Sequence, residues 1–348
     1  MKLLILTQTV DRDDPILGFF CRWIEEFSKR CEKVTVICLK RGRYEFPDNV
    51  KVLSLGKENG TNRIKYVWNF FKYLRRERHN YSAVFVHMNP IYLVLAGWWW
   101  KLTGKRISLW YTHRQVDLKL RIAEKFSDRI FTASKDSFRL SSQKVKIVGH
   151  GIPLDLFAKP HDHSRDDSKF RLISVGRITP IKNLDILIRA SAILRHKITN
   201  LEVLIVGEPV HPGDQEYLEK LQRIVQQEQL EPIVHFVGSV PNERVREYYW
   251  KSDISVNLCP TGGVDKAVLE SMASGLPVFV SNRGFQDYLG RYQENLMFLD
   301  RDPNDLADKI IRFKEGVEQK QITDFLLTSV RERSSLTTLI SKINEEMQ

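Results

Sequence analysis

Short apolar stretches alternate with longer stretches of helical period along the first 158 residues. The short stretches are continuously apolar, as expected for strands that are buried on both faces. They predict seven strands: Lys2–Thr7, Lys33–Leu39, Val50–Leu55, Ala83–His87, Arg106–Tyr111, Arg129–Thr132 and Val145–Val148. The longer stretches predict five helices: Ile16–Arg30, Ile64–His79, Ile91–Leu102, Leu118–Phe126 and Ser134–Leu140. This alternation is typical of a parallel sheet covered by helices.

The pattern stops at residues 159–169 and then starts again. The segment contains no aliphatic residue and no Phe, Tyr or Trp, which is typical of a solvated linker between domains. After it, six strands are predicted: Arg171–Val175, Glu202–Val206, Ile233–Val237, Ile254–Leu258, Pro277–Val280 and Leu296–Leu299. The helices predicted with them are Asn183–Arg195, Gln215–Gln229, Glu243–Trp250, Lys266–Ser274 and Pro303–Glu315.

Two doubly wound α/β domains in tandem account for this order of elements. We expect an N-terminal Rossmann-like domain at residues 1–158 and a C-terminal one at residues 170–315, facing each other across a cleft. Residues 316–348 are polar with apolar residues at helical spacing, and we expect them to form helices that pack back toward the N-terminal domain. In open parallel sheets, ligands bind at the carboxyl ends of the strands, so the cleft is the expected site.

Composition excludes several classes of protein. A chain of 348 residues with 42% hydrophobic and 28% charged residues is typical of a folded, water-soluble protein. The longest apolar stretch runs only from Ile91 to Trp100, whereas a membrane-spanning helix needs about 20 residues. Met1 leads directly into a strand-like segment, so no signal peptide is expected. The four cysteines show no metal-site or disulfide spacing, which favours reduced thiols and a cytoplasmic location.

Charge is unevenly distributed along the chain. Residues 1–155 contain 29 Lys and Arg against 15 Asp and Glu, and the remainder contains 25 against 28, giving the net charge of +11. A basic half attracts an anionic partner such as nucleic acid, anionic lipid or a phosphorylated substrate, although a merely solubilising surface is the simpler alternative. The basic segment Arg75–Arg78 could contact anionic lipid, bind a phosphorylated acceptor or simply be solvated. The cluster Trp98–Lys101 could pack in the core or contact a membrane interface.

The first candidate motif for chemistry is Val175–Leu184. A predicted strand ends at Gly176, a short loop carries Arg177, and Lys182 stands at the start of the next helix. Backbone amides at a helix start together with two cations suit a diphosphate group. The structural alternative is an ordinary glycine turn with two surface cations.

The second candidate motif is Pro260–Val278. A predicted strand runs into the glycines Gly262 and Gly263, and the helix that follows carries Asp265 and Glu270. The two carboxylates differ by about 140° around the helix, so they do not serve one target. A carboxylate facing the cleft could accept hydrogen bonds from two ribose hydroxyls. The alternatives are a helix N-cap for Asp265 and a solvated helix face for Glu270.

These motifs together resemble the donor-binding half of retaining glycosyltransferases of the GT4 type, which have the GT-B fold. The resemblance rests on Gly176-Arg177, on Lys182-Asn183 and on the run from Glu270 to Val278 in this order and spacing. It covers most of the chain and is most specific at residues 170–280. Supporting elements are Leu204–Gly207 and the segment Val148–Pro153, which is similar to the family's crossover between domains.

The resemblance implies a role for each matching residue. Arg177 and Lys182 would neutralise the diphosphate of a nucleotide-sugar, and Glu270 would hold the ribose, without a metal ion. His113 would lie beside the donor sugar, and Arg177, Lys182 and His113 form the expected catalytic set. The expected donor-binding set is Gly18, Gly176, Arg177, Lys182, Gly207, Gly262, Gly263, Asp265, Lys266, Leu269 and Glu270. His87, at a strand end, is either a substrate contact or an interior histidine.

The chain departs from the family at one important position. The family carries a further glutamate where this chain has Gly262, so the donor sugar must be contacted from elsewhere, with Asp265 and Lys266 as the nearest polar candidates. The expected function is that of a metal-independent hexosyltransferase in cell-surface polysaccharide or glycolipid synthesis, without a cofactor. The resemblance further implies that residues 170–315 bind the nucleotide-sugar, with UDP or GDP as the expected nucleotide. Residues 1–158 would bind the acceptor, a sugar or a lipid-linked molecule.

Alternatives to transfer follow from the same observations. The departure at Gly262 leaves open a non-catalytic nucleotide-binding protein, and a nucleotide-sugar epimerase would share the fold. A nucleic-acid-binding function would explain only the positive charge of residues 1–155, and no DNA- or RNA-recognition motif supports it. The residues favour a cytoplasmic protein, with peripheral contact to the inner face of an anionic membrane left open. They do not identify the base, the sugar, the acceptor, the linkage or the oligomeric state.

Overall fold

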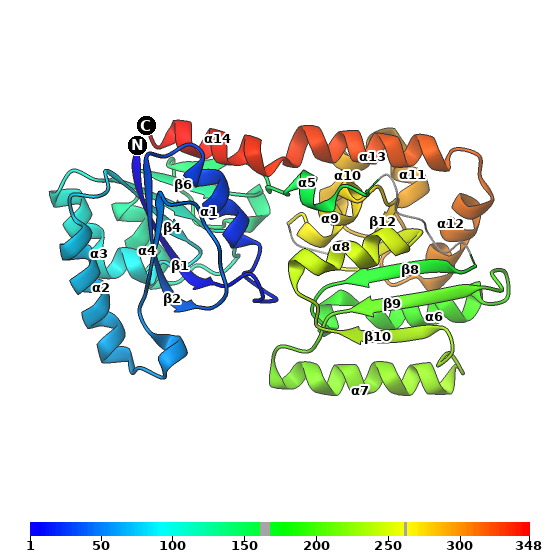
Figure 1. The fold of residues 1–348 in the computed structure, drawn as a ribbon. Helices are drawn as coiled ribbons and strands as arrows, with labels where there is room; N and C mark the ends of the chain where they lie inside the picture. Colours follow the sequence, from blue (N-terminus) through cyan, green and yellow to red (C-terminus); the bar gives the residue numbers. More distant parts are fainter. Residues whose placement is uncertain (161–167, 261–262) are drawn as a thin grey trace. The chain divides into compact units, whose positions relative to one another are not determined.

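The computed structural model describes residues 1–160, 168–260 and 263–348. They form two compact units, each built around its own parallel sheet (Figure 1). The first unit contains Met1–Pro153, Pro241–Glu243 and Leu336–Gln348, and the second contains Leu154–Val240 and Arg244–Ser335. The expected α/β class with two Rossmann-like sheets is confirmed.

The first unit has a seven-stranded sheet in the order β3-β2-β1-β4-β5-β6-β7, in which all strand pairs are parallel. Its strands are β1 (Lys2–Val10), β2 (Lys33–Arg41), β3 (Val50–Ser54), β4 (Ala83–His87), β5 (Arg106–Trp110), β6 (Arg129–Thr132) and β7 (Val145–Ile147). Its helices are α1 (Phe20–Ser28), α2 (Arg63–Glu77), α3 (Ile91–Leu102), α4 (Leu118–Phe126) and α14 (Leu336–Glu346).

Both faces of this sheet are buried, as its continuous apolar strands predict. In β1, Leu3 and Ile5 pack on one face with residues of α1 and α14. Leu4 and Leu6 pack on the other face with residues of α2, α3 and α4. The alternation of side chains along an extended strand therefore divides one apolar run between two cores.

The second unit has a five-stranded parallel sheet in the order β10-β9-β8-β11-β12. Its strands are β8 (Phe170–Val175), β9 (Leu201–Val206), β10 (Val234–Gly238), β11 (Ile254–Asn257) and β12 (Val278–Val280). The longer helices are α6 (Leu184–Leu194), α7 (Pro212–Gln227), α8 (Asn242–Lys251), α12 (Pro303–Glu315) and α13 (Gln319–Ser334). Shorter ones are α5 (Leu154–Phe157), α9 (Lys266–Ala273), α10 (Gln286–Leu289) and α11 (Gln293–Leu296).

Two predicted elements are wrong. The segment Leu296–Leu299 is not a strand, because α11 ends at Leu296 and only Met297 forms an isolated bridge, with Val280. The segment Ser134–Leu140 forms only a 3-10 turn over Lys135–Ser137. The hydroxyls of Ser134 and Ser137 hydrogen-bond to each other at 2.8 Å, a local alternative to helical hydrogen bonds.

The C-terminal helices divide between the two units. Helix α13 belongs to the second unit, and α14 belongs to the first, where it packs against α1. Residues 161–167 of the expected linker lie outside the described residues. The assignment of acceptor binding to residues 1–158 and of donor binding to residues 170–315 stays a prediction.

Candidate functional site

The strand order of the second unit brings the two candidate motifs together. Strands β8 and β11 are neighbours, but the chain builds the sheet outward from β8 to β9 and β10 on one side before it adds β11 and β12 on the other. The carboxyl ends of β8 and β11 therefore form the switch point at which open parallel sheets bind ligands. The first motif follows β8 directly, and the second follows β11.

Glycines form the end of the sheet on one side of this point. Strands β8 and β9 are followed by Gly176 and Gly207, and β10 ends on Gly238, all with positive φ angles of 148°, 139° and 83°. A Cβ on Gly207 would lie 2.0 Å from the carbonyl oxygen of Gly176. Glycine is required at Gly207 for this close approach of two backbones.

Lys182 and Asp265 form an ion pair that joins the two motifs. Lys182 lies in the 3-10 turn Pro180–Lys182 before α6, and Asp265 is the N-cap of α9. The Asp265 carboxylate also accepts hydrogen bonds from the Ala267 amide at 3.2 Å and from Asn257 Nδ2 at 3.1 Å. The N-cap interpretation of Asp265 is confirmed, and any contact of Asp265 with a donor stays a prediction.

The pair is held in its charged form. Desolvation by burial raises the pKa of Asp265, but the charge and hydrogen bond of Lys182 lower it more, so its pKa lies below the ordinary value. Burial lowers the pKa of Lys182, but the opposite charge of Asp265 raises it more, so its pKa lies above the ordinary value. An ammonium group that is only 17% exposed thus lies at the switch point with its charge intact.

Arg177 lies on the same loop in a different setting. It is exposed, whereas its neighbour Ile178 is 1% exposed and donates its amide to the carbonyl of Glu208 at 3.0 Å. Ile178 therefore anchors the loop, and Arg177 is available from solvent. One cation of the motif is preorganised by a partner and the other is presented on the surface.

Helix α9 carries the remaining predicted residues of the second motif. Glu270 is 6% exposed, so the interpretation as a solvated helix face is wrong. Leu269 is fully buried, so its side chain packs in the interior. Lys266 lies one helical turn before Glu270, and desolvation lowers its pKa to about 7 even though Glu270 and Asp265 act to raise it. A lysine whose pKa lies far below its ordinary value is unusual, and together with the Lys182–Asp265 pair it marks this helix start as a candidate functional site.

Sequence reasoning missed two asparagines at strand ends. Asn257 ends β11, is 6% exposed, and accepts a hydrogen bond from the Cys259 amide at 3.3 Å while it donates to Asp265. Asn282 follows β12, is 5% exposed, and donates to the Gly263 carbonyl at 3.5 Å. Their position at carboxyl ends of predicted strands was the available signal. Gly263 itself is half-buried, and Gly262 lies outside the described residues.

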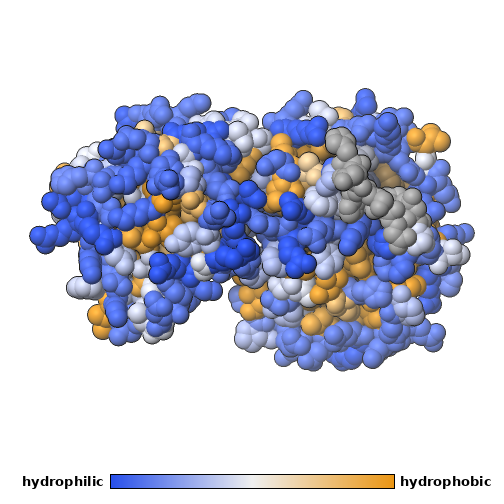
Figure 2. Space-filling view, in the orientation of Figure 1, coloured by the Kyte–Doolittle hydropathy of each residue, from blue (hydrophilic) through white to orange (hydrophobic). Residues whose placement is uncertain are grey.

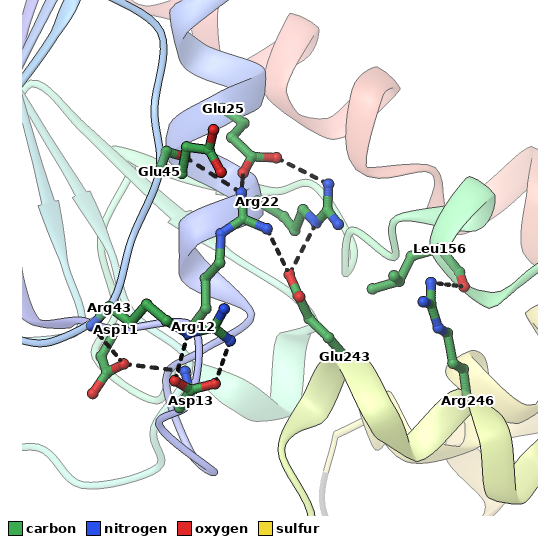
Figure 3. A network of polar contacts seen from close by, with 10 residues as sticks. All are labelled: Asp11, Arg12, Asp13, Arg22, Glu25, Arg43, Glu45, Leu156, Glu243 and Arg246. Carbon is green, nitrogen blue, oxygen red and sulfur yellow. Dashed lines mark hydrogen bonds and ion pairs between the residues drawn. The ribbon is translucent and has the colours of Figure 1, made fainter.

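Gly18 of the first unit lies in the loop between β1 and α1. A Cβ there would lie 2.6 Å from the Asp14 carbonyl oxygen, so the tight turn requires glycine. The carboxylates of this loop bind the segment after β2. Arg43 donates to the Asp13 carboxylate, and the Asp11 carboxylate accepts the Arg43 amide at 3.1 Å (Figure 3). Helix α1 starts at Phe20 and not at Ile16 as predicted, because this loop occupies the intervening residues.

Two histidines of the first unit differ in environment. His113 follows β5, is exposed, and accepts a hydrogen bond at Nδ1 from the Gln115 amide at 3.2 Å. His87, the last residue of β4, is 1% exposed, and its ring stacks on Phe20 with 3.9 Å between centroids. The structure supports the interpretation of His87 as an interior strand-end histidine. The role of His113 beside a donor sugar stays a prediction.

The described residues also bear on metal-dependent and membrane-spanning classes of protein. In residues 1–160, 168–260 and 263–348, no group of three His, Cys, Asp or Glu side chains is placed to hold a metal ion. No helix within the same ranges has the length and apolar character needed to cross a membrane.

Comparisons with known proteins support the resemblance. Residues 157–323 match the family model of glycosyl transferases group 1. The chain is 29% identical to the amylovoran biosynthesis glycosyltransferase AmsK of Erwinia amylovora over 183 residues, which cover 50% of this chain and 43% of that protein. It is 27% identical to D-inositol 3-phosphate glycosyltransferase of Thermomonospora curvata over 195 residues, covering 51% and 45%. The chain thus spans less than half the length of these curated relatives.

A solved structure resembles the chain over nearly its full length. The crystal structure of Anabaena Alr3699/HepE in complex with UDP superposes with a TM-score of 0.76 at 16% identity and covers 99% of each chain. The same protein in complex with UDP-glucose gives a TM-score of 0.74 at 16% identity and covers 99% of this chain and 98% of that one. This likeness confirms the GT-B fold class.

Proposed function

We propose, from the premise that residues 157–323 belong to the family of group 1 glycosyl transferases, that the protein transfers a sugar from a nucleotide-sugar to an acceptor. The observation that carries the proposal is the switch point of the second unit. There the strand order joins the Lys182 loop to the N-terminus of α9, beside a sheet edge formed by glycines. This arrangement suits a diphosphate and a ribose.

The chemistry of transfer assigns a task to each group. The bond between the anomeric carbon and the β-phosphate oxygen breaks while a bond to the acceptor hydroxyl oxygen forms, and the hydroxyl proton passes to the departing phosphate. Negative charge develops on that phosphate, and Arg177 and Lys182 stabilise it without a metal ion. The buried carboxylate of Glu270 accepts the ribose hydroxyls. Attack from the side of the leaving group retains the anomeric configuration.

Asp265 has a specific task in this proposal. In the structure it holds Lys182, so a diphosphate binds by sharing or replacing this carboxylate as the partner of the ammonium group. Lys266 supplies a second ammonium beside Glu270, and its lowered pKa rises when an anion binds nearby. Gly176, Gly207 and Gly263 allow the ligand to approach the backbone, and His113 orients the sugar. Gly18 and Gly262 complete the proposed donor set.

We propose UDP as the nucleotide and a hexose as the sugar. The support is the similar fold of Alr3699/HepE, which was crystallised with UDP and with UDP-glucose. The names of the curated relatives support two kinds of acceptor, a growing polysaccharide and a phosphorylated polyol. We further propose a cytoplasmic enzyme that meets a lipid-linked or sugar acceptor at the inner face of the membrane, and no nucleic-acid partner.

Thermal unfolding with UDP, GDP and UDP-glucose tests the donor site. A ligand at 100 times its dissociation constant adds about 2.7 kcal/mol to the free energy of unfolding. We expect UDP and UDP-glucose to stabilise the wild type and Arg177→Ala to lose most of this gain. Arg223→Ala, an exposed arginine on α7, is the matched control and keeps the gain. A gain that survives in Arg177→Ala contradicts the proposed site.

Turnover separates transfer from the non-catalytic alternative that Gly262 leaves open. Release of UDP from UDP-glucose in the presence of an acceptor extract is measured for the wild type and for Lys182→Ala. Transfer predicts release that depends on both acceptor and Lys182. Nucleotide binding without release supports the binding-protein alternative, and conversion of the donor without an acceptor identifies an epimerase.

A further inference from the structure

Helix α2 has two apolar faces, and the core of the first unit uses only one. Phe70 and Leu74 are 1% and 3% exposed and pack into the core. Ile64, Trp68 and Phe71, at positions i, i+4 and i+7, form a second stripe and are 81%, 60% and 40% exposed. A surface helix of a globular protein needs one apolar stripe. The second stripe therefore calls for another explanation.

Helix α3 extends this exposed stripe. Trp98 and Leu102, one helical turn apart, are 48% and 79% exposed. Helices α2 and α3 lie side by side (Figure 1), and residues from both line a groove of about 530 Å³. The groove is lined by Phe71, Leu74, Arg75, Arg78, Trp98 and Trp99. We call the exposed side chains of Ile64, Trp68, Phe71, Arg75, Arg78, Trp98 and Leu102 the α2–α3 surface.

The polar groups beside the stripe are almost all cations. Residues 63–78 contain six exposed Lys and Arg: Arg63, Lys65, Lys72, Arg75, Arg76 and Arg78. The sole acid in this range, Glu77, is 1% exposed and forms ion pairs with Lys51 and Arg76. Lys72 lies over the ring of Trp68, with 4.8 Å from its Nζ to the ring centroid. The surface thus presents aromatic and aliphatic groups framed by positive charge.

Elsewhere among the described residues, the exposed large apolar side chains do not form a stripe framed by cations. The face of the protein in Figure 2 is mainly hydrophilic, with hydrophobic residues in separate small groups. Exposed large apolar residues beyond α2 and α3 include Val317 and Leu299, which stand in loops, and Leu118, at the first turn of α4. Single exposed apolar residues are normal on proteins, whereas a stripe at helical spacing with a basic frame indicates a partner.

We propose that the α2–α3 surface docks on an anionic lipid bilayer. Tryptophan rings favour the headgroup level, and an in-plane helix with an apolar stripe and flanking cations is attracted by acidic lipids. Ile64, Trp68 and Trp98 enter the interface, and Arg75 and Arg78 bind lipid phosphates at the rim of the groove. A second copy of the chain fits poorly, because a two-fold contact would set the cations of α2 against themselves.

Docking would place the enzyme beside a lipid-linked acceptor, and this purpose alone rests on the proposed function. The contact itself is a property of the first unit and does not require the donor site. Vesicle binding and nucleotide binding can therefore fail separately. If UDP did not stabilise the wild type but vesicles still bound it, the proposed donor site would be refuted and the docking surface would not.

Co-sedimentation of the full chain with vesicles tests the docking surface. We expect the wild type to bind vesicles that contain phosphatidylglycerol and to remain in solution with phosphatidylcholine alone, and we expect added salt to weaken binding. Trp68→Gln/Trp98→Gln removes the two exposed rings, and Arg75→Glu/Arg78→Glu reverses two charges. Each pair should weaken binding about 30-fold or more, on the scale of two surface cations.

Matched controls keep the test specific. Arg189→Glu/Arg223→Glu makes the same change in net charge on exposed residues of the second unit and should bind vesicles as the wild type does. All variants replace exposed side chains, so an unchanged unfolding midpoint and an unchanged shift with UDP verify the fold. Equal binding to neutral and anionic vesicles, or equal loss in the control, overturns the proposal. Dimerisation that the tryptophan pair abolishes also overturns it, because a second copy would then cover the surface.

Discussion

The two sheets share a topology but differ at the place where each could bind a ligand. The strand order reverses between β1 and β4 in the first unit and between β8 and β11 in the second. At the second switch point the loops carry glycines and a charged Lys182–Asp265 pair, and helix α9 carries a buried glutamate. At the first, His87 stacks on Phe20, and the loop after β1 is tied by its own carboxylates. Topology therefore predicts where a ligand site can form, and the residues at the strand ends decide which groups line it.

The difference has a simple physical basis. A glycine at a strand end leaves the backbone uncovered, so a phosphate can reach it, whereas aromatic rings packed against a strand end bury apolar area and stabilise the fold. The following variants test this contrast, in order of decreasing expected effect.

Gly207→Ala should destabilise the second unit most strongly. Its Cβ would lie 2.0 Å from the Gly176 carbonyl oxygen at a φ of 139°, so we expect a loss of about 4 kcal/mol and loss of the gain with UDP. Urea unfolding measures the loss. Gly213→Ala, where a Cβ meets no atom within 4 Å, is the control and should change stability by less than about 1 kcal/mol. If Gly207→Ala were as stable as the wild type, glycine would not be required at this end of the sheet.

Asp265→Ala should cost about 3 kcal/mol, because it removes an N-cap and leaves the Lys182 ammonium without its partner. The lowered pKa of Asp265 means that its contribution is present above the ordinary carboxyl pKa and is lost as pH falls through the folded pKa. The raised pKa of Lys182 means that the contribution is lost only as pH rises through that value. The stability difference from wild type should thus be constant at neutral pH and shrink at both extremes. A difference that stays constant in strong acid would refute the ion pair.

His87→Ala should lower the free energy of unfolding by about 2 kcal/mol through lost packing in the first unit. The gain with UDP should stay equal to that of the wild type, because the residue is part of an interior stack. Calorimetry with and without UDP measures both quantities. If the variant kept its stability but lost the UDP gain, His87 would be a donor contact and not a packing residue, and the contrast between the two strand ends would fail.

Lys266→Met should have the smallest effect, visible only as a change in pH dependence. Because the pKa of Lys266 is about 7, wild-type affinity for UDP should fall about tenfold between pH 6 and pH 8, while the variant should show a flat profile. Titration calorimetry across this range measures the affinity. If the affinity of wild type and variant for UDP changed equally with pH, Lys266 would not contribute to UDP binding.

Local pattern predicted most elements because strands and helices have different apolar periods. The predictions that failed depend on context. The segment Leu296–Leu299 is apolar enough for a strand, yet no further pairing partner is available beyond the bridge to Val280. A solvated helix face was one prediction for Glu270, because charged residues are mostly exposed. Its burial follows from the packing of α9 in the second unit.

The sequence by itself determined the alternation of elements, the glycines at the strand ends, the N-cap at Asp265 and the resemblance to a family of transferases. Those features are local, because they depend on side-chain period, on backbone freedom and on hydrogen bonds between near neighbours. Tertiary structure alone decided that β8 adjoins β11, that Lys182 pairs with Asp265, that His87 lies in a stack, and that one apolar face of α2 remains exposed. Each of these outcomes depends on contacts between residues distant in the chain, and periodicity carries no information about which distant residues meet.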